Sequence, residues 1–177
     1  MTKILIGERV FLRPFTPEDA ELVLAGANNP DSAKLTGTQQ TFVREQVDAY
    51  IQRSIAGEGR AAFIFADSAD DRVIGEVVIN EMDDINRSAN LRIAIFDTAD
   101  WSKGYGTDAM RLMVKYGFET LKLHRIELGV YDFNPRAIRV YEKIGFKREG
   151  VLREVLQWGG AYHNMIMMSI LEWEYAG

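Results

Sequence analysis

The stretch WSKGYGTDAM, residues 101–110, carries the first candidate for chemistry. Its glycines, Gly104 and Gly106, follow an apolar run and precede an amphipathic segment. Glycine at such a junction lets backbone N–H groups approach a ligand, and the positive end of the following helix favours an anion. The N–H groups of Ser102 to Thr107, with Lys103 as a nearby charge, therefore suit a pyrophosphate. A glycine-rich turn that only lets helix and strand pack explains these residues equally well.

The same string also fits the dinucleotide fingerprint G-x-G-x-x-G/A over Gly104 to Ala109, with Glu127 about 20 residues further on. The fingerprint needs its first glycine directly after the strand, whereas the residues Asp97 to Lys103 intervene here. The chain also ends in a hairpin instead of further strand–helix repeats. A dinucleotide-dependent oxidoreductase is therefore the weaker alternative.

A second stretch, residues 134–146, combines Asn134, Tyr141 and a closing Gly145-Phe146. Asparagine followed by proline is an ordinary helix start, and Tyr141 shares a helical face with apolar residues. Capping and core packing thus explain both residues without catalysis. A phenol held by a helix is nevertheless a weak acid that can protonate a leaving group. These residues alone leave both interpretations open.

A sheet and several helices must position the two stretches. Period-two runs predict strands at 9–15, 61–66, 72–80, 89–96, 125–131, 147–157 and 161–171. Helical spacing and caps predict one helix that starts with Thr16 as N-cap and ends at 26–32, and others at 41–55, 105–121 and 135–144. The strand–helix–strand unit at 89–131 requires a parallel pair, and short turns elsewhere require antiparallel neighbours. The sequence predicts an α/β fold with a mixed, mostly antiparallel sheet, in one domain spanning residues 1–177.

Together the two stretches resemble the GNAT superfamily of acyl-CoA-dependent N-acetyltransferases. In that family a loop of the form Q/R-x-x-G-x-G/A precedes an asparagine, and a tyrosine follows the asparagine on a helix. Residues 101–106 occupy the loop position here, with Trp101 in place of the usual glutamine or arginine, ahead of Asn134 and Tyr141. The resemblance covers nearly the whole chain and is greatest to the branch of ribosomal-protein N-terminal acetyltransferases and bacterial spermidine acetyltransferases.

The resemblance implies a single-domain GNAT fold, with a splayed central parallel pair and helices on both faces, and acetyl-CoA as cosubstrate. It implies that the loop backbone holds the pyrophosphate of coenzyme A and that the edge of the 89–96 strand pairs with the pantetheine arm. Tyr141 would protonate the leaving thiolate, and a strand N–H would polarise the carbonyl. The implied cofactor-binding residues are Ile95, Phe96, Ser102, Lys103, Gly104, Tyr105, Gly106, Thr107, Asn134 and Tyr141.

The general base is less well defined. Some relatives carry a glutamate five residues before the asparagine, and that position is Gly129 here. The candidates are Glu76, Glu81, Asp97 and His163, besides a chain of waters. Glu81 ranks first because it borders the cleft that the resemblance implies. Tyr141 and Glu81 are thus the expected catalytic residues.

Composition limits the partners. The formal net charge of −5 argues against nucleic-acid binding. No apolar run approaches the roughly 18 residues of a membrane span, so a cytoplasmic protein is expected. The chain has no cysteine and two histidines, which predicts no metal site.

The acceptor is a primary amine whose identity the sequence leaves open. A polyamine, a protein N-terminus, an amino acid and an aminoglycoside-like drug are all compatible, and a peptide or small-metabolite amine is slightly favoured. Its pocket is expected from residues 26–45 and 155–163. The C-terminal hairpin is a candidate homodimer surface. The alternative from another class is a non-catalytic acyl-CoA-binding sensor.

Overall fold

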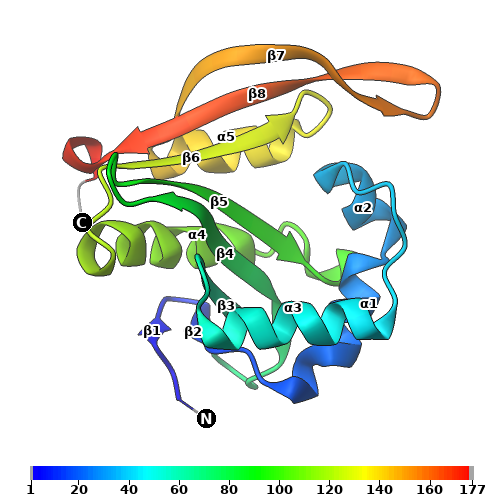
Figure 1. The fold of residues 1–177 in the computed structure, drawn as a ribbon, viewed down its shortest axis with the longest axis vertical. Helices are drawn as coiled ribbons and strands as arrows, with labels where there is room; N and C mark the ends of the chain where they lie inside the picture. The colour runs from blue at the N-terminus through cyan, green and yellow to red at the C-terminus, as the bar shows by residue number, and fades with distance from the viewer. Residues whose placement is uncertain (1, 176–177) are drawn as a thin grey trace.

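The computed structural model describes residues 2–175. Its centre is an eight-stranded sheet with strand order β1-β2-β3-β4-β5-β6-β8-β7 (Figure 1). Neighbouring strands run antiparallel except β5 and β6, which are parallel, so the predicted mixed sheet is confirmed. The strands are β1 (Leu5–Ile6), β2 (Val10–Arg13), β3 (Ala61–Asp67), β4 (Val73–Asp83), β5 (Ser88–Ile95), β6 (Arg125–Tyr131), β7 (Lys147–Trp158) and β8 (Ala161–Leu171). The helices are α1 (Ala20–Ala27), α2 (Pro30–Thr36), α3 (Arg44–Ala56), α4 (Tyr105–Lys115) and α5 (Pro135–Ile144).

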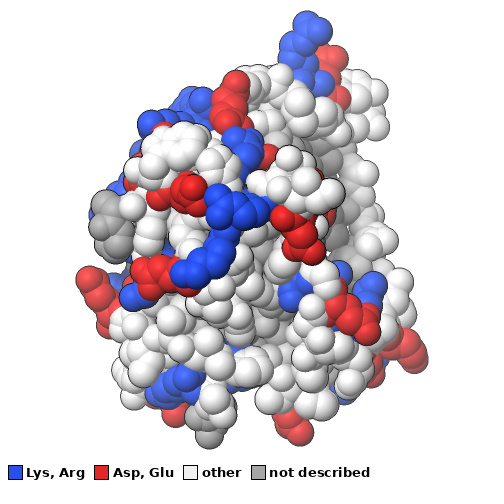
Figure 2. All heavy atoms as spheres, turned by 60° about the vertical axis from the view of Figure 1, so that its left-hand side comes forward, with Lys and Arg blue, Asp and Glu red and all other residues white. Residues whose placement is uncertain are grey.

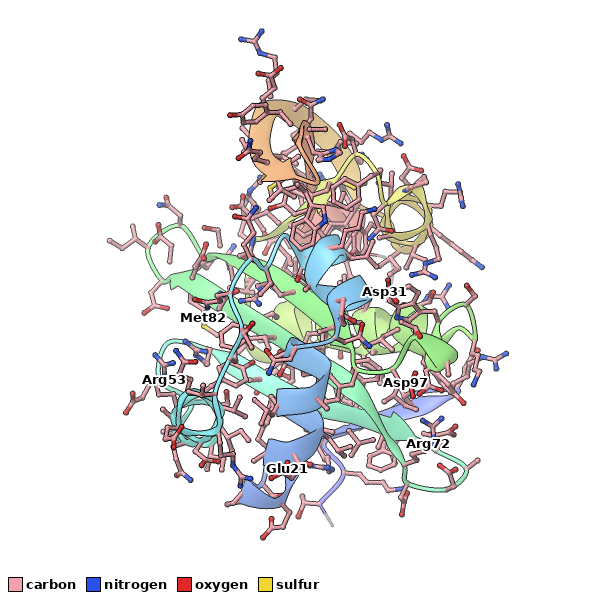
Figure 3. All side chains as sticks on the ribbon, turned by 90° about the vertical axis from the view of Figure 1, so that its right-hand side faces the viewer. Glu21, Asp31, Arg53, Arg72, Met82 and Asp97 are labelled. Carbon is pink, nitrogen blue, oxygen red and sulfur yellow. The ribbon has the colours of Figure 1, made fainter. Side chains whose placement is uncertain are left out.

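The helices cover both faces of the sheet because strand side chains alternate between two cores. On β3, Phe63 and Phe65 belong to the core that contains side chains of α4 and α5. Their neighbours Ala62 and Ile64 belong to the core beneath α1 and α3. Figure 3 shows α1 and α2 lying over this second face. Whether a residue stands at an odd or an even position along a strand therefore decides which of the two cores its side chain enters.

The parallel pair is joined only where its strands begin. Ser88–Asn90 of β5 pair with Arg125–Glu127 of β6, and β5 has no further β6 partner in the described chain. β6 instead pairs with β8 over its whole length, from Arg125 to Tyr131. A gap therefore opens beside residues 91–95 of β5, bordered by unpaired backbone groups. This is the splay that the resemblance implies.

The expectation that residues 26–32 only end the first helix is wrong, because the short helix α2 starts within them. Asn29 caps α2 by accepting the N–H groups of Asp31 and Ser32 at 3.0 and 3.2 Å. Gly37 ends it with a φ of 68°. The caps are ordinary signals, but two turns of helix are too short for hydrophobic periodicity to detect. β1, with two residues, escapes detection for the same reason.

The helix expected at 105–121 is α-helical to Lys115 and continues as a π-helical turn over Tyr116–Thr120. A Cβ placed on Gly117 would lie 2.6 Å from Cδ1 of Ile126 on β6. Glycine therefore lets this wider turn press against the sheet. The change of helix type follows from tertiary packing, which the helical periodicity of the sequence does not encode.

On the face shown in Figure 2, acidic and basic side chains lie interspersed, with uncharged surface between them. This mixture agrees with the mild formal net charge of −5. No helix within residues 2–175 is both long enough and apolar enough to cross a bilayer.

A buried ion pair holds the first helical turn against β2. Arg13 and Asp19 have side chains only 4% exposed and share hydrogen bonds of 2.8 and 2.5 Å. Thr16, at the predicted N-cap position, donates its N–H to Asp19 at 2.8 Å. Burial by itself raises the pKa of Asp19, but the bonds from Arg13 and Thr16 outweigh burial and the pKa is lowered.

Asp19→Ala should lower the free energy of unfolding by about 3–5 kcal/mol at neutral pH, because it leaves the Arg13 guanidinium buried without a counter-charge. Since the folded-state pKa of Asp19 is lowered, its contribution is present above the unfolded value of about 3.9 and is lost as the pH falls through the folded value. Urea unfolding of both proteins at neutral and acidic pH measures this difference. Asp48→Ala, which breaks an exposed pair with Arg44, is the control and should change little. Equal losses in the two variants would contradict the assignment.

Candidate active site

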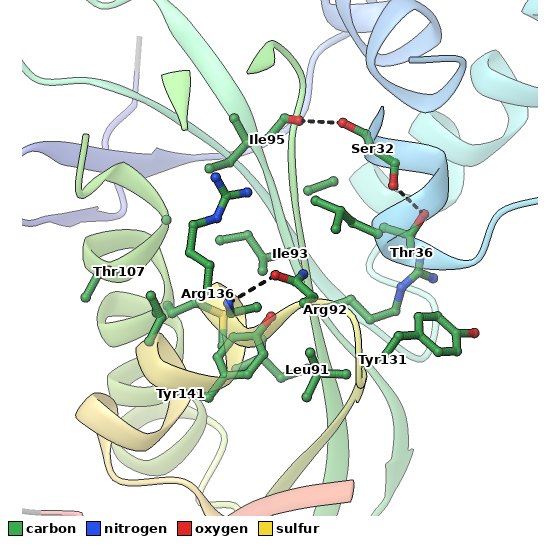
Figure 4. A pocket seen from close by; sticks show the side chains of 18 of the residues that line it. Ser32, Thr36, Leu91, Arg92, Ile93, Ile95, Thr107, Tyr131, Arg136 and Tyr141 are labelled. Carbon is green, nitrogen blue, oxygen red and sulfur yellow. Dashed lines mark hydrogen bonds between the residues drawn. The ribbon is translucent and has the colours of Figure 1, made fainter. Parts of the chain in front are cut away.

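A cavity of about 600 Å³ occupies the gap between β5 and β6 (Figure 4). Because the side chains of β5 alternate, the cavity has walls on both faces of the sheet. We call one wall the loop side; it includes Ile93, Ile95, Trp101, Ser102, Gly104, Gly106, Thr107, Asn134, Arg136 and Tyr141. The other wall, the α2 side, includes Ser32, Leu35, Thr36, Glu76, Arg92, Gly129, Tyr131, Met165 and Met167. One cavity thus connects the two faces through the sheet.

The turn before α4 exposes a row of backbone donors on the loop side. Ser102 and Gly104 adopt left-handed φ values of 64° and 88°. Within residues 2–175, the N–H groups of residues 102–107 have no protein acceptor. They lie at the positive end of α4, where the first-turn N–H groups of a helix lack intrahelical partners. This arrangement can bind a phosphate or pyrophosphate group.

Asp108 anchors this turn to the sheet. Its buried carboxylate accepts the N–H group of Arg9, just before β2, at 2.8 Å and that of Val10, in β2, at 3.0 Å. Gly7 makes room for it, since a Cβ there would collide with the carboxylate. The exposed side chain of Arg9 lies against Gly104, where an added Cβ would be 3.1 Å from Nε. The start of α4 is therefore fixed, and a cation lies beside it.

The side chains of two residues in this loop, Lys103 and Tyr105, point away from the cavity. Lys103 binds the buried Asp100 at 3.2 Å, and Arg72 binds the same carboxylate at 2.6 and 2.9 Å. The hydrogen bonds from Arg72 hold the pKa of Asp100 below its usual value. Tyr105 donates its hydroxyl to Asp67 at 2.5 Å. Neither Lys103 nor Tyr105 lines the cavity, so each offers only its backbone N–H there.

A cation–π contact joins the loop to α5. The guanidinium of Arg136 lies 4.4 Å from the ring centroid of Trp101, and both residues line the cavity. The contact brings a positive charge to the loop side. The tryptophan that replaces the usual glutamine or arginine therefore packs against an arginine from the opposite side of the gap.

Asn134 and Tyr141 come from the two ends of α5. The side-chain oxygen of Asn134 accepts the N–H of Ala137 at 3.1 Å, which confirms the predicted cap and leaves the amide NH₂ as a donor. Tyr141 is half-buried against the core, and its hydroxyl has no hydrogen-bond partner in the described chain. Burial raises the pKa of this phenol to about 12. The hydroxyl is therefore protonated at neutral pH and available as a donor in the cavity (Figure 4).

The edge of β5 presents alternate residues to the gap. Phe96 donates its N–H to Ile74 of β4 at 3.0 Å, so even-numbered positions bond to β4 while Ile93 and Ile95 face the gap. Phe96, which the resemblance puts beside the cofactor arm, is absent from the cavity lining, and its ring packs under α1. The carbonyl of Ile95 accepts the hydroxyl of Ser32 at 3.2 Å (Figure 4).

Glu76 is the one of the four candidate bases that lines the cavity of the described chain. It is half-buried on β4 and accepts the hydroxyl of Tyr50 at 3.1 Å. Burial raises the pKa of Glu76, although the positive charge of Arg92 opposes the rise. The carboxyl is therefore poised to hold a proton at a higher pH than an exposed glutamate does.

The other three candidates lie outside the cavity. Glu81, ranked first from the sequence, lies at an irregularity of β4 with a φ of 52°, where the regular register with β5 is lost. Asp97, labelled in Figure 3, accepts the N–H of Ala99 at 2.8 Å and so caps the short turn that follows β5. His163 lies 3.7 Å from Asp132. The position of Glu81 beside the predicted cleft did not predict where its side chain points, because a bulge in β4 changes the face of the sheet to which side chains point.

The α2 side contains residues that the sequence did not single out. Met165 and Met167 pair with Tyr131 and Gly129 across β6 and β8, so strand alternation puts all four on one face. Arg92 lies on the same face of β5, two positions from Ala94. The sequence could have indicated these residues only through the alternation of side chains along each strand. Their shared face follows from that alternation only when the register between the strands is known.

The two segments expected to form the acceptor pocket differ in whether they line the cavity. Residues 26–45 contribute Ser32, Leu35 and Thr36 to the cavity through α2. Residues 155–163 do not line it, although the Gln39 side chain donates to the carbonyl of Gln157. The C-terminal hairpin instead contributes the methionines of β8.

Comparisons with known proteins agree with this geometry. The family described as acetyltransferase (GNAT) domain matches residues 9–147. A Bacillus subtilis protein named a probable N-acetyltransferase is 34% identical, over 95% of this chain and 97% of its own. The spermidine N(1)-acetyltransferase of Escherichia coli K12 is 30% identical, over 94% of this chain and 88% of its own.

A solved structure extends the likeness to three dimensions. The spermidine N-acetyltransferase of Vibrio cholerae, in complex with CoA and spermine, superimposes with a TM-score of 0.88 at 27% identity and covers 95% of this chain and 98% of that chain. The splayed strand pair, the glycine turn before α4 and the match over most of the sequence lead to one conclusion. The chain belongs to the GNAT family of acetyltransferases.

Proposed function

We propose that this acetyltransferase moves the acetyl group of acetyl-CoA to a primary amine. The observation that carries the proposal is a single cavity that joins backbone donors, a strand edge and a tyrosine hydroxyl, all without partners in the part of the chain that the structure describes. These three features suit the phosphates, the extended arm and the leaving sulfur of one molecule. The α2 side of the same cavity leaves room for the amine.

The residues of the loop side fit coenzyme A. The N–H groups of residues 102–107 and the guanidinium of Arg136 would hold the pyrophosphate. The outward backbone groups of Ile93 and Ile95 would bond the arm as a neighbouring strand does. The free amide NH₂ of Asn134 would reach the arm from the other side of the gap.

Acetyl-CoA supplies a thioester, and direct attack by the amine transfers its acetyl group from sulfur to nitrogen. An outward N–H of Ile93 or Ile95 polarises the acetyl oxygen. Tyr141 donates to the sulfur as the carbon–sulfur bond breaks. Because an ordinary thiol has a pKa of about 8.5, below that of this phenol, Tyr141 acts chiefly by a hydrogen bond. If Tyr141 does give its proton to the sulfur, it regains one from the acetylated nitrogen, which must lose a proton to become a neutral amide.

We assign the deprotonation of the amine to Glu76 instead of Glu81. The Glu76 carboxyl lies in the cavity wall, and the hydroxyl of Tyr50 orients it. Burial raises the pKa of Glu76, which makes its carboxylate a stronger base. The proton then passes from the amine to this carboxylate and on to solvent.

Saturating acetyl-CoA should raise the melting temperature. A ligand at a hundred times its dissociation constant adds about 2.7 kcal/mol, or about 5–10 °C for a chain of this size. NAD and ATP in parallel thermal-shift measurements are the controls. A shift with NAD alone would instead support the dinucleotide-dependent enzyme. A shift with acetyl-CoA but no thiol release with any amine would support the acyl-CoA-binding sensor.

Tyr141→Phe should lower kcat by about 10²-fold or more and leave acetyl-CoA affinity nearly unchanged, because it removes only the donor to the leaving sulfur. Thiol release under saturating amine measures kcat, and calorimetry measures the affinity. With the phenol pKa near 12, activity should not fall through ionisation of Tyr141 up to about pH 10. Full activity of the variant at every pH would remove Tyr141 from the mechanism.

Glu76→Gln should lower kcat/KM by about 10²-fold or more, since an amide cannot accept the proton. In the native enzyme kcat/KM should decline as the pH falls below the raised pKa of Glu76, because the protonated carboxyl is no base. The variant should lack this decline of kcat/KM at acidic pH. Glu81→Gln is the matched control and should keep both the native kcat/KM and its decline at acidic pH. A loss in Glu81→Gln with none in Glu76→Gln would restore Glu81 as the base.

A further inference from the structure

Arg92 is a charged cavity residue that the mechanism above does not use. It lines the α2 side, its side chain is exposed, and within residues 2–175 it makes no ion pair and no side-chain hydrogen bond. In Figure 4 it extends from β5 on the same side as Thr36 and Tyr131. An unpaired guanidinium in a cavity wall has five N–H donors ready for an anion.

The nearby carboxylate does not neutralise this charge. Glu76 lies diagonally across β4 and β5 from Arg92 on the same face, since Val78 pairs with Arg92 and Glu76 with Ala94. Arg60 also acts on Glu76 electrostatically. Glu76 is thus the acidic residue of the described α2 side, and it feels the positive charges of both Arg92 in the wall and Arg60 outside it.

The phosphates of the cosubstrate do not account for Arg92. The phosphate-binding turn packs on the face of the sheet that Ile93 and Ile95 serve, and Arg92 points to the opposite face. Asp100, the other acidic residue of the described cavity lining, is already bound by Arg72 and Lys103. If Arg92 binds an anion in this cavity, the acceptor is therefore its source.

We propose that the acceptor is a primary amine that also carries a carboxylate, such as an α-amino acid, and that Arg92 binds this carboxylate while the amine lies beside Glu76. The inference rests on the proposed function of the same site. The guanidinium can receive a carboxylate through two parallel hydrogen bonds. Met165, Met167 and Leu35 give the rest of the α2 side an apolar surface that suits an uncharged side chain.

A polyamine is a poor match for this wall. Its several positive charges would meet Arg92 at close range, and Glu76, the acidic residue of the described α2 side, already feels the charges of Arg92 and Arg60. The relatives from Escherichia coli and Vibrio cholerae are named spermidine acetyltransferases. We therefore expect spermidine acetylation to be a weak activity of this chain.

The test compares L-leucine with L-leucinamide, which share the side chain and differ in the carboxylate. Thiol release at saturating acetyl-CoA should give leucine a kcat/KM at least about 10-fold above leucinamide, per free amine, because a charged hydrogen bond is lost in the amide. Arg92→Gln should remove this preference. Comparing the leucine-to-leucinamide ratio of kcat/KM between Arg92→Gln and the native enzyme cancels the different basicities of the two amines.

Arg53→Gln is the matched control, because Arg53 is an exposed arginine of α3 outside the cavity, and this variant should keep the preference. The same preference in native enzyme and Arg92→Gln would overturn the inference. So would a higher kcat/KM for spermidine than for leucine, or a clear preference for phosphoethanolamine, whose anion is a phosphate.

A binding measurement separates failure of this inference from failure of the proposed function. Calorimetry with CoA present compares N-acetyl-leucine with its amide on native enzyme and on Arg92→Gln. Absence of thiol release with every amine would reject the proposed function, yet tighter binding of the acid that Arg92→Gln abolishes would still support Arg92 as the carboxylate site. Equal binding of acid and amide to the native enzyme would reject that site.

Discussion

A strand that loses its neighbour must find other partners for its backbone N–H and C=O groups, and β5 loses β6 after Asn90. The loss is possible because β6 satisfies its own groups with β8 throughout its length. The edge of β5 is therefore open in the middle of the sheet, where open edges are rare. Helices on both faces shield it from other chains, and the cavity forms around it.

The anchors around the gap keep it in shape. Asp108 fastens the start of α4 to β2, and Asp100 ties the preceding turn to Arg72 before β4. On the other side, the cap of Asn134 sets the start of α5 and thereby the direction from which Tyr141 approaches. These bonds join segments far apart in sequence, so the geometry of the cavity depends on the whole fold and not on a local motif.

Motifs and periodicity predicted the parts that local sequence determines. The glycine turn, the cap at Asn134, the long helices and most strands follow from side-chain types at short spacing, and the resemblance supplied their arrangement. Glu81 and Phe96 show the limit, because a bulge and one step of strand parity decide which face a residue serves. Arg92 and the methionines of β8 were missed for a related reason: their shared wall exists only once three strands are in register. Local spacing cannot specify that register.

The bond between Ser32 and Ile95 links the two halves of the cavity. The hydroxyl belongs to α2, which forms part of the proposed acceptor wall, and the carbonyl belongs to the strand edge along which we propose that the cosubstrate arm lies. A carbonyl oxygen has two lone pairs, so a ligand on that edge shares its acceptor with α2 instead of finding it free. A ligand that weakened the Ser32 bond would loosen α2, and binding in one half of the cavity would then depend on occupancy of the other. Such heterotropic coupling is reciprocal by thermodynamic necessity: whatever factor one ligand imposes on the affinity of the second, the second imposes on the first.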